Sequence, residues 1–252
     1  MTVIESIVRH ERRVLMTAIV LVPVVCGAWI VPMALDMYGP MTGASAWMMT
    51  SAWNLRYTAT LAAMWIVMMV GMMTPAASPA LLIYAAVMRR YEGPRAALRV
   101  YPMAAGYLLV WTAFSIGAVL LQRALSISVL SPMMKLTDSW AAALLLMAAA
   151  YQITPFKAAC LDSCRSPTDF ISSHMRSGAG GAFRMGVRHG ALCVGCCWAL
   201  MLLLFVGGVM NLWTIAALTL FVLMEKLSPF GARTARITAA GLALIAVWIL
   251  AL

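Results

Sequence analysis

Five of the six cysteines and two of the three histidines lie between residues 157 and 198. Thiolate and imidazole groups together suit zinc, copper(I) and iron–sulfur chemistry. This stretch therefore predicts a thiol-rich metal or redox site, although a buried cysteine can also be a small apolar core residue. The candidate ligands are Cys160, Cys164, His189, Cys193, Cys196 and Cys197.

The spacing of these residues places them on two helix faces. Cys160 and Cys164 are four residues apart, so on a helix they share one face. His189, Cys193 and Cys196 are spaced i, i+4, i+7, and Cys197 widens that face only modestly. The pattern is neither that of a zinc finger nor that of a ferredoxin. Spacing alone leaves the metal open, with zinc or another thiophilic ion as an alternative to copper.

Methionine favours copper among these ions. The chain has 22 methionines, and Met64, Met68 and Met72 form an i, i+4, i+8 ridge with Met69 and Met73 beside it. A thioether is a soft, neutral ligand that accepts copper(I) and needs no deprotonation. The alternative is that methionine fills gaps in an apolar core. The ridge and the cysteines together predict a copper(I) site.

Three charged positions add to the candidate site. Glu225 and Lys226 close an apolar segment, where charges are costly and often functional, although a local ion pair at the surface is an equal alternative. Asp162 lies between Cys160 and Cys164 and could orient a ligand by a hydrogen bond.

The whole chain has the composition of an integral membrane protein. Its residues are 64% hydrophobic and 10% charged, whereas a soluble domain is about one quarter charged. A spanning helix needs about 20 apolar residues, and the apolar runs predict a single all-α transmembrane domain over residues 1–252. The seven expected spans cover residues 14–36, 57–77, 101–122, 139–154, 186–208, 210–226 and 235–252.

The distribution of positive charge predicts the orientation of these spans. Of the 18 lysines and arginines, all but Arg56, Arg123 and Lys135 lie in the N-terminal segment and in alternate loops. Such loops face the cytoplasm, which predicts a cytoplasmic N-terminus, an external C-terminus and a cytoplasmic Cys-containing loop at residues 155–185. We expect a bacterial inner membrane protein whose net charge of +10 sets topology and does not bind nucleic acid.

The second predicted span is longer than a bilayer requires. Its apolar run continues from Tyr57 to Met88 and contains Pro75 and Pro79, each of which removes a helix hydrogen bond. We expect either a break near Thr74–Pro79 followed by a helix along the interface, or a simple proline kink.

These motifs resemble a bacterial family described as predicted metal-binding integral membrane proteins, a domain of unknown function. The resemblance covers nearly the whole chain and implies a polytopic membrane protein with a metal site. The motif residues are Trp65, Met68, Met69, Met72, Met73 and Pro75; Pro155, Lys157, Cys160, Leu161, Cys164, Arg165 and Pro167; Gly186, His189, Gly190, Cys193, Gly195, Cys196, Cys197, Trp198, Leu200 and Met201; and Glu225 and Lys226.

The function expected from these residues is copper handling. Methionines would receive copper(I) outside and pass it to a cytoplasmic Cys/His site for release to a thiol chaperone. A metal or thiol oxidoreductase acting on a lipid-soluble substrate is the alternative, with Cys196 or Cys197 as the reactive thiol. A third alternative is an assembly subunit with a structural metal. Whether the chain is an enzyme, a homo-oligomer or part of a membrane complex stays open.

The shared site makes a geometric prediction. Ligand sulfurs around one metal lie within about 4 Å of each other, with some relaxation when the site is empty. At least one of Cys160 and Cys164 should therefore lie within about 8 Å, sulfur to sulfur, of a cysteine in the 193–197 group.

Overall fold

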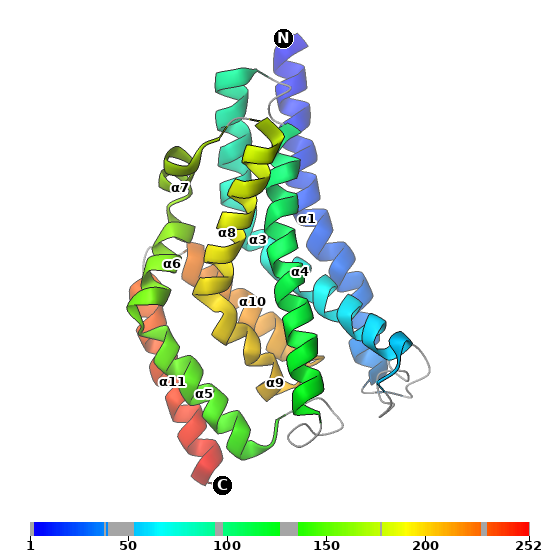
Figure 1. Ribbon diagram of the computed structural model, residues 1–252, viewed down its shortest axis with the longest axis vertical. Coiled ribbons are helices and arrows are strands. Elements are labelled where there is room, and N and C mark those ends of the chain that lie inside the picture. The colour runs from blue at the N-terminus through cyan, green and yellow to red at the C-terminus, as the bar shows by residue number, and fades with distance from the viewer. Residues whose placement is uncertain are drawn as a thin grey trace.

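The computed structural model describes residues 3–37, 39, 53–93, 98–126, 136–176, 178–227 and 231–251. These residues are almost entirely helical, so the all-α prediction is confirmed (Figure 1). The helices are α1 (Val3–Met37), α3 (Leu55–Glu92), α4 (Val100–Leu125), α5 (Asp138–Gln152), α6 (Pro155–Arg165), α7 (Pro167–His174), α8 (Gly178–Leu202), α9 (Leu204–Gly207), α10 (Leu212–Leu227) and α11 (Gly231–Ala251).

The number of helices that could cross a membrane differs from the prediction of seven. By length and composition, five described segments qualify, in α1, α3, α4, α8 with α9, and α11. The pair α5 and α6, bent by 65°, raises the number to six if it forms one broken span. The segment predicted at 210–226 is α10, which has only 16 residues and is shorter than the roughly 20 that a span requires.

Successive helices nevertheless alternate in direction along the long axis of the molecule. Figure 1 shows α1 descending, α3 rising, α4 descending, α5 with α6 rising, α8 descending, α10 rising and α11 descending. The N-terminal and C-terminal ends of the chain accordingly lie at opposite ends of the molecule.

Of the two alternatives for the second span, the break near Thr74–Pro79 is wrong, because α3 runs without a break through Pro75 and Pro79, as in the proline-kink alternative. Pro79 has no N–H to give to the carbonyl of Pro75, and the Ser78 hydroxyl donates to that carbonyl instead at 2.7 Å. The Thr74 hydroxyl donates to the Val70 carbonyl at 2.6 Å. Side-chain hydroxyl groups thus donate hydrogen bonds to backbone carbonyls near the prolines. The helix axis bends, but the helix does not end (Figure 1).

Glycines bring α4 and α8 into close contact. A Cβ added at Gly186 would lie 1.9 Å from the Met103 carbonyl oxygen, and one at Gly106 would lie 2.3 Å from that of Phe183. Small residues of this kind let helix backbones approach closely in membranes. The close approach fixes the position of the α8 cysteines relative to Tyr107 on α4.

The segment 155–185, expected as a loop, consists of α6, α7 and the first turns of α8. Thr154 ends the bend after α5 and caps α6, since its hydroxyl oxygen accepts from the backbone N–H of Lys157 at 3.3 Å. Pro155 occupies the first turn of α6, where its missing N–H is not needed. The sequence therefore starts a new helix that carries Cys160 and Cys164 back toward α8.

Candidate metal centre

Cys160 reaches α8 at a glycine. The Cys160 side chain is buried, and a Cβ added at Gly195 would lie 2.9 Å from its Sγ atom. The carbonyl of the same glycine accepts a hydrogen bond from the Tyr151 hydroxyl. Because Gly195 has no side chain, the Cys160 sulfur on α6 can lie close to the backbone of α8.

Cys164 and Cys196 bring the two thiol faces together. Their side chains interact with each other, so the α6 and α8 thiols lie close together as predicted. Cys193, Cys196 and Cys197 are each only 1% exposed. The thiols of Cys196 and Cys197 donate to the Cys193 carbonyl oxygen at 3.1 and 2.9 Å. We name Cys160, Cys164, Cys193, Cys196 and Cys197 the thiol cluster.

A buried ammonium group lies within the thiol cluster. The Nζ atom of Lys226 on α10 donates to the Cys193 sulfur at 2.7 Å. Lys226 also interacts electrostatically with Cys164, Cys196 and Cys197, and its side chain is buried. A buried cation favours negatively charged neighbours, so this arrangement can stabilise thiolates at a depth where an unpaired charge would be costly.

Tyr107 joins the thiol cluster to α3. Its hydroxyl oxygen lies 3.1 Å from the Cys193 sulfur and donates to the Met73 carbonyl oxygen at 3.0 Å. The tyrosine is 2% exposed. It therefore ties α3, α4 and α8 together at Cys193.

Glu225 forms a buried ion pair with Lys157. Lys157 Nζ lies 2.6 Å from Glu225 Oε1, and both side chains are 1% exposed. The alternative of a local surface ion pair between Glu225 and Lys226 is wrong, because both side chains are buried and each binds a different partner. Glu225 binds Lys157 on α6, and Lys226 binds Cys193 on α8.

His189 lies beside the cluster with a nitrogen that has no partner. Its side chain is 3% exposed, its ring packs against Tyr107 and Phe170, and it interacts electrostatically with Cys196. Its Nδ1 atom has no hydrogen-bond partner among the described residues. By contrast, the Nδ1 atom of His174 lies 2.9 Å from the Phe170 carbonyl oxygen.

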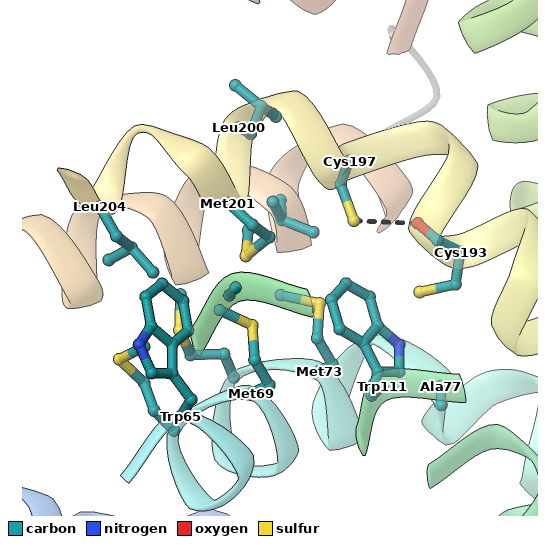
Figure 2. Packing of buried hydrophobic residues seen from close by; sticks show 14 of the residues in the cluster. Trp65, Met69, Met73, Ala77, Trp111, Cys193, Cys197, Leu200, Met201 and Leu204 are labelled. Atoms are coloured by element: carbon teal, nitrogen blue, oxygen red, sulfur yellow. Dashed lines mark hydrogen bonds between the residues drawn. The ribbon is translucent and has the colours of Figure 1, made fainter. Parts of the chain in front are cut away.

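The methionines divide between two faces of α3. Figure 2 shows the sulfurs of Met69 and Met73 facing Met201 and Cys197 across the space between α3 and α8. Met64, Met68 and Met72 of the predicted ridge are buried at 0%, 2% and 4% exposure. Met68 and Met72 line a separate cavity on the side of α1. The methionines beside the thiol cluster are therefore the neighbours of the predicted ridge.

Asp162 lies on another face of α6. Its side chain is exposed and lines a small pocket with Gln152 and Arg236, next to α11. It is two residues from both Cys160 and Cys164, which places it on the opposite side of the helix.

The donor chemistry of the cluster fits a soft metal ion, but its side chains are not yet arranged around one. Among the described residues, no group of three or more Cys, His, Asp or Glu side chains stands in position to hold a metal. Two thiols donate to a backbone carbonyl, and Cys193 accepts from Lys226. Rotation of these side chains, with the orphaned His189 nitrogen close by, would be needed to gather ligands.

Sequence reasoning missed the roles of Tyr107, Gly195 and Lys157 at this site. Lys157 and Gly195 were part of the recognised motifs, but nothing in their spacing indicated their contacts. An isolated tyrosine in an apolar span carries no signal by itself. A buried tyrosine needs a partner for its hydroxyl, and only the packing of α4 against α3 and α8 identifies the partners as the Met73 carbonyl and the Cys193 sulfur.

Comparison with known proteins agrees with the soft-metal chemistry of this centre. No protein of curated function and no solved structure matches the chain. The model of one family, described as PpoB2, copper chaperone, matches residues 62–249. This range includes α4 to α10 and every residue of the thiol cluster. The chain therefore belongs to the PpoB2 copper chaperone family.

Proposed function

We propose that this protein is a membrane copper(I)-binding protein that holds the ion at the thiol cluster and transfers it to a partner. The observation that carries the proposal is the contact between Cys164 and Cys196, which joins two helices inside a buried set of sulfurs. Thiolate ligands suit copper(I), zinc and iron–sulfur clusters, and the thioethers of the nearby methionines favour copper(I) among these. The family description, copper chaperone, supports the same ion.

The charges around the cluster support a monovalent ion. Two thiolates that bind copper(I) carry a net charge of −1, and a buried net charge is costly unless it is compensated. The ammonium of Lys226, which already contacts Cys193 at 2.7 Å, supplies one positive charge. A pair of thiolates, copper(I) and Lys226 together are neutral. Transfer of the ion to a thiol partner then requires no change in its oxidation state.

Methionine sulfurs would deliver the ion to the cluster. Met69 and Met73 lie between α3 and α8 beside Cys197 (Figure 2), and their thioethers can hold copper(I) without deprotonation. The ridge of Met64, Met68 and Met72 continues the same helix. Of the methionines expected to receive copper outside, Met33 and Met37 are buried in α1, and those at positions 41, 48, 49, 133 and 134 lie outside the described residues.

The proposed setting is a bacterial inner membrane, with the cluster near the cytoplasmic face and a soluble thiol chaperone as partner. Five apolar helices of sufficient length support a membrane protein, and the alternating helix directions in Figure 1 support termini on opposite sides. Asymmetry of lysine and arginine supports the inward N-terminus. A C-terminal reporter that is active only in the periplasm tests this topology, and we expect it to be active. Activity of a C-terminal reporter that works only in the cytoplasm would contradict the external C-terminus.

Copper binding to the purified protein tests the function. The protein in detergent is titrated anaerobically with Cu(I) against a coloured chelator, beside a Cys164→Ser/Cys196→Ser variant. We expect the variant to lose one bound ion per chain, or to hold it at least tenfold more weakly. His174→Ala is the matched control, because His174 lies in α7 and contacts Phe170. Equal copper binding by the parent and the double variant would overturn the proposal.

The rival oxidoreductase function predicts a different result. A membrane thiol oxidase would turn over with a quinone and would need a reactive thiol in the cluster. Turnover that is abolished by Cys196→Ser or Cys197→Ser, in protein that binds no copper, would support the rival.

A further inference from the structure

A cavity of about 300 Å³ lies between α1, α3 and α10, apart from the thiol cluster. Its lining includes three sulfur side chains, from Cys26 on α1 and from Met68 and Met72 on α3. Met68 and Met72 are one helical turn apart, so they lie on the same face of α3. The cavity therefore gathers a thiol and two thioethers from two helices.

The position of Cys26 depends on a glycine. A Cβ added at Gly71 would lie 2.8 Å from the Cys26 Cβ and 3.6 Å from its Sγ atom. Gly71 belongs to the same face of α3 as Met68 and Met72. The missing side chain at Gly71 lets α1 approach α3 and places the Cys26 thiol beside the two methionines.

The described residues that line this cavity include no charged side chain. The hydroxyl of the lining residue Thr219 donates to the Ile215 carbonyl of its own helix at 2.7 Å. The sulfurs are therefore the groups left to bind a ligand in a largely apolar space. One thiolate and one monovalent cation form a neutral unit, whereas a divalent cation would leave a positive charge in an apolar lining that nothing there compensates.

We infer that Cys26, Met68 and Met72 form a second site for a soft monovalent metal ion, copper(I), in the cavity between α1, α3 and α10. As the copper–sulfur bond forms, the S–H bond of Cys26 breaks and its proton passes to water outside the cavity, and the two thioethers complete the set of ligands without any change in oxidation state. The site extends the proposed function, because it would hold copper on the α1 side of α3 before transfer to the thiol cluster.

The fold connects this site to the thiol cluster in two ways. Met69 and Met73, each next in sequence to a cavity methionine, face α8 (Figure 2). Helix α10 contributes Thr219 to the cavity and Lys226 to the cluster, and seven residues of helix span roughly 10 Å. This separation is short enough for an ion to pass around α3 from the sulfurs of the cavity to those of the thiol cluster.

A protein in which Cys26 is the only cysteine isolates the second site. Cys160, Cys164, Cys193, Cys196 and Cys197 are replaced by Ser, and the purified protein is titrated with Cu(I) and, as a redox-inert probe, Ag(I). We expect one ion per chain, lost on addition of Cys26→Ser and weakened at least tenfold by Met68→Leu/Met72→Leu. Met88→Leu is the matched control, because Met88 is buried on α3 but does not line the cavity.

The single variant Cys26→Ser in the otherwise native chain keeps the test decisive if the five-serine protein does not fold. It should bind one copper(I) fewer than the parent while the thiol cluster keeps its own ion. Equal stoichiometry of the parent and Cys26→Ser, or absence of bound ion in the Cys26-only protein, would overturn the second site. Neither result bears on copper binding at the thiol cluster, which the Cys164→Ser/Cys196→Ser variant tests separately.

Discussion

The thiol cluster and the α1–α3–α10 cavity both contain sulfur ligands but differ in charge. The cluster lies beside Lys226 and next to the Lys157–Glu225 pair, whereas the residues described around the cavity carry no charge. A buried ammonium allows more than one thiolate at a site, and an uncharged lining allows one thiolate per monovalent ion. Charge would therefore set how many thiolates each site uses and how firmly it holds copper.

The largest effect should come from the ion pair that supports the cluster. Glu225→Gln leaves Lys157 buried without its carboxylate, and breaking such a pair costs about 3–5 kcal/mol. The variant should melt at a lower temperature, as followed by size-exclusion chromatography after heating. Adding Lys157→Met removes the orphaned charge and should restore most of the lost stability, and failure to do so would mean that Glu225 acts in another way.

The second-largest effect should come from the close packing of α4 and α8 at Gly186, which supports the thiol cluster. Gly186→Ala places a methyl group 1.9 Å from the Met103 carbonyl oxygen, and overpacking of this kind costs about 1–3 kcal/mol. We expect lower thermal stability and weaker copper binding at the cluster. Gly117→Ala on α4 is the control, since a Cβ there meets nothing within 4 Å. Equal melting of both variants would contradict the close α4–α8 packing.

The counter-charge should affect the cluster alone. Lys226→Met removes the ammonium from Cys193, so two thiolates with copper(I) keep an uncompensated negative charge. We expect at least tenfold weaker Cu(I) binding at the cluster, about 1.4 kcal/mol, with Cys26-dependent binding unchanged. Lys226→Arg keeps the charge and should retain part of the affinity. Unchanged affinity in Lys226→Met would show that the ammonium has no part in binding.

The smallest effect on stability should come from the methionines. Replacing Met64, Met68 and Met72 by Leu conserves volume closely and should cost less than about 1.5 kcal/mol, so the protein should remain folded. Copper transport into vesicles should nevertheless fall. The matching Met69→Leu/Met73→Leu variant tests the face toward α8, and parental transport in both variants would assign every one of these methionines to packing.

The sequence was sufficient for the helical class and for the pairing of the two cysteine faces. Apolar runs and i, i+4 spacing are local properties, so they survive in the fold. The sequence left open whether α3 continues through Pro75 and Pro79, because the Ser78 hydroxyl that satisfies the freed carbonyl is a polar group with many other uses. The span count also differed, because α5 and α10 have only 15 and 16 residues, fewer than the roughly 20 that a span requires.

The contacts of charged and isolated residues could not be predicted for a different reason. Glu225 and Lys226 are adjacent in sequence but bind different helices, and only tertiary packing decides which way each side chain points. Cys26 carried no signal as a single cysteine in an apolar span, since its neighbours Met68 and Met72 come from α3. A site built from side chains of helices that are far apart in the sequence produces no periodic pattern along the chain.

X-ray absorption of Cu(I)-loaded protein tests the central claim most directly. In Cys26→Ser protein, which removes the second site, we expect copper(I) with sulfur neighbours, and loss of this signal when Cys164→Ser/Cys196→Ser is added. Copper bound only by nitrogen and oxygen, or a sulfur signal that persists without Cys164 and Cys196, would contradict copper(I) binding by the thiol cluster.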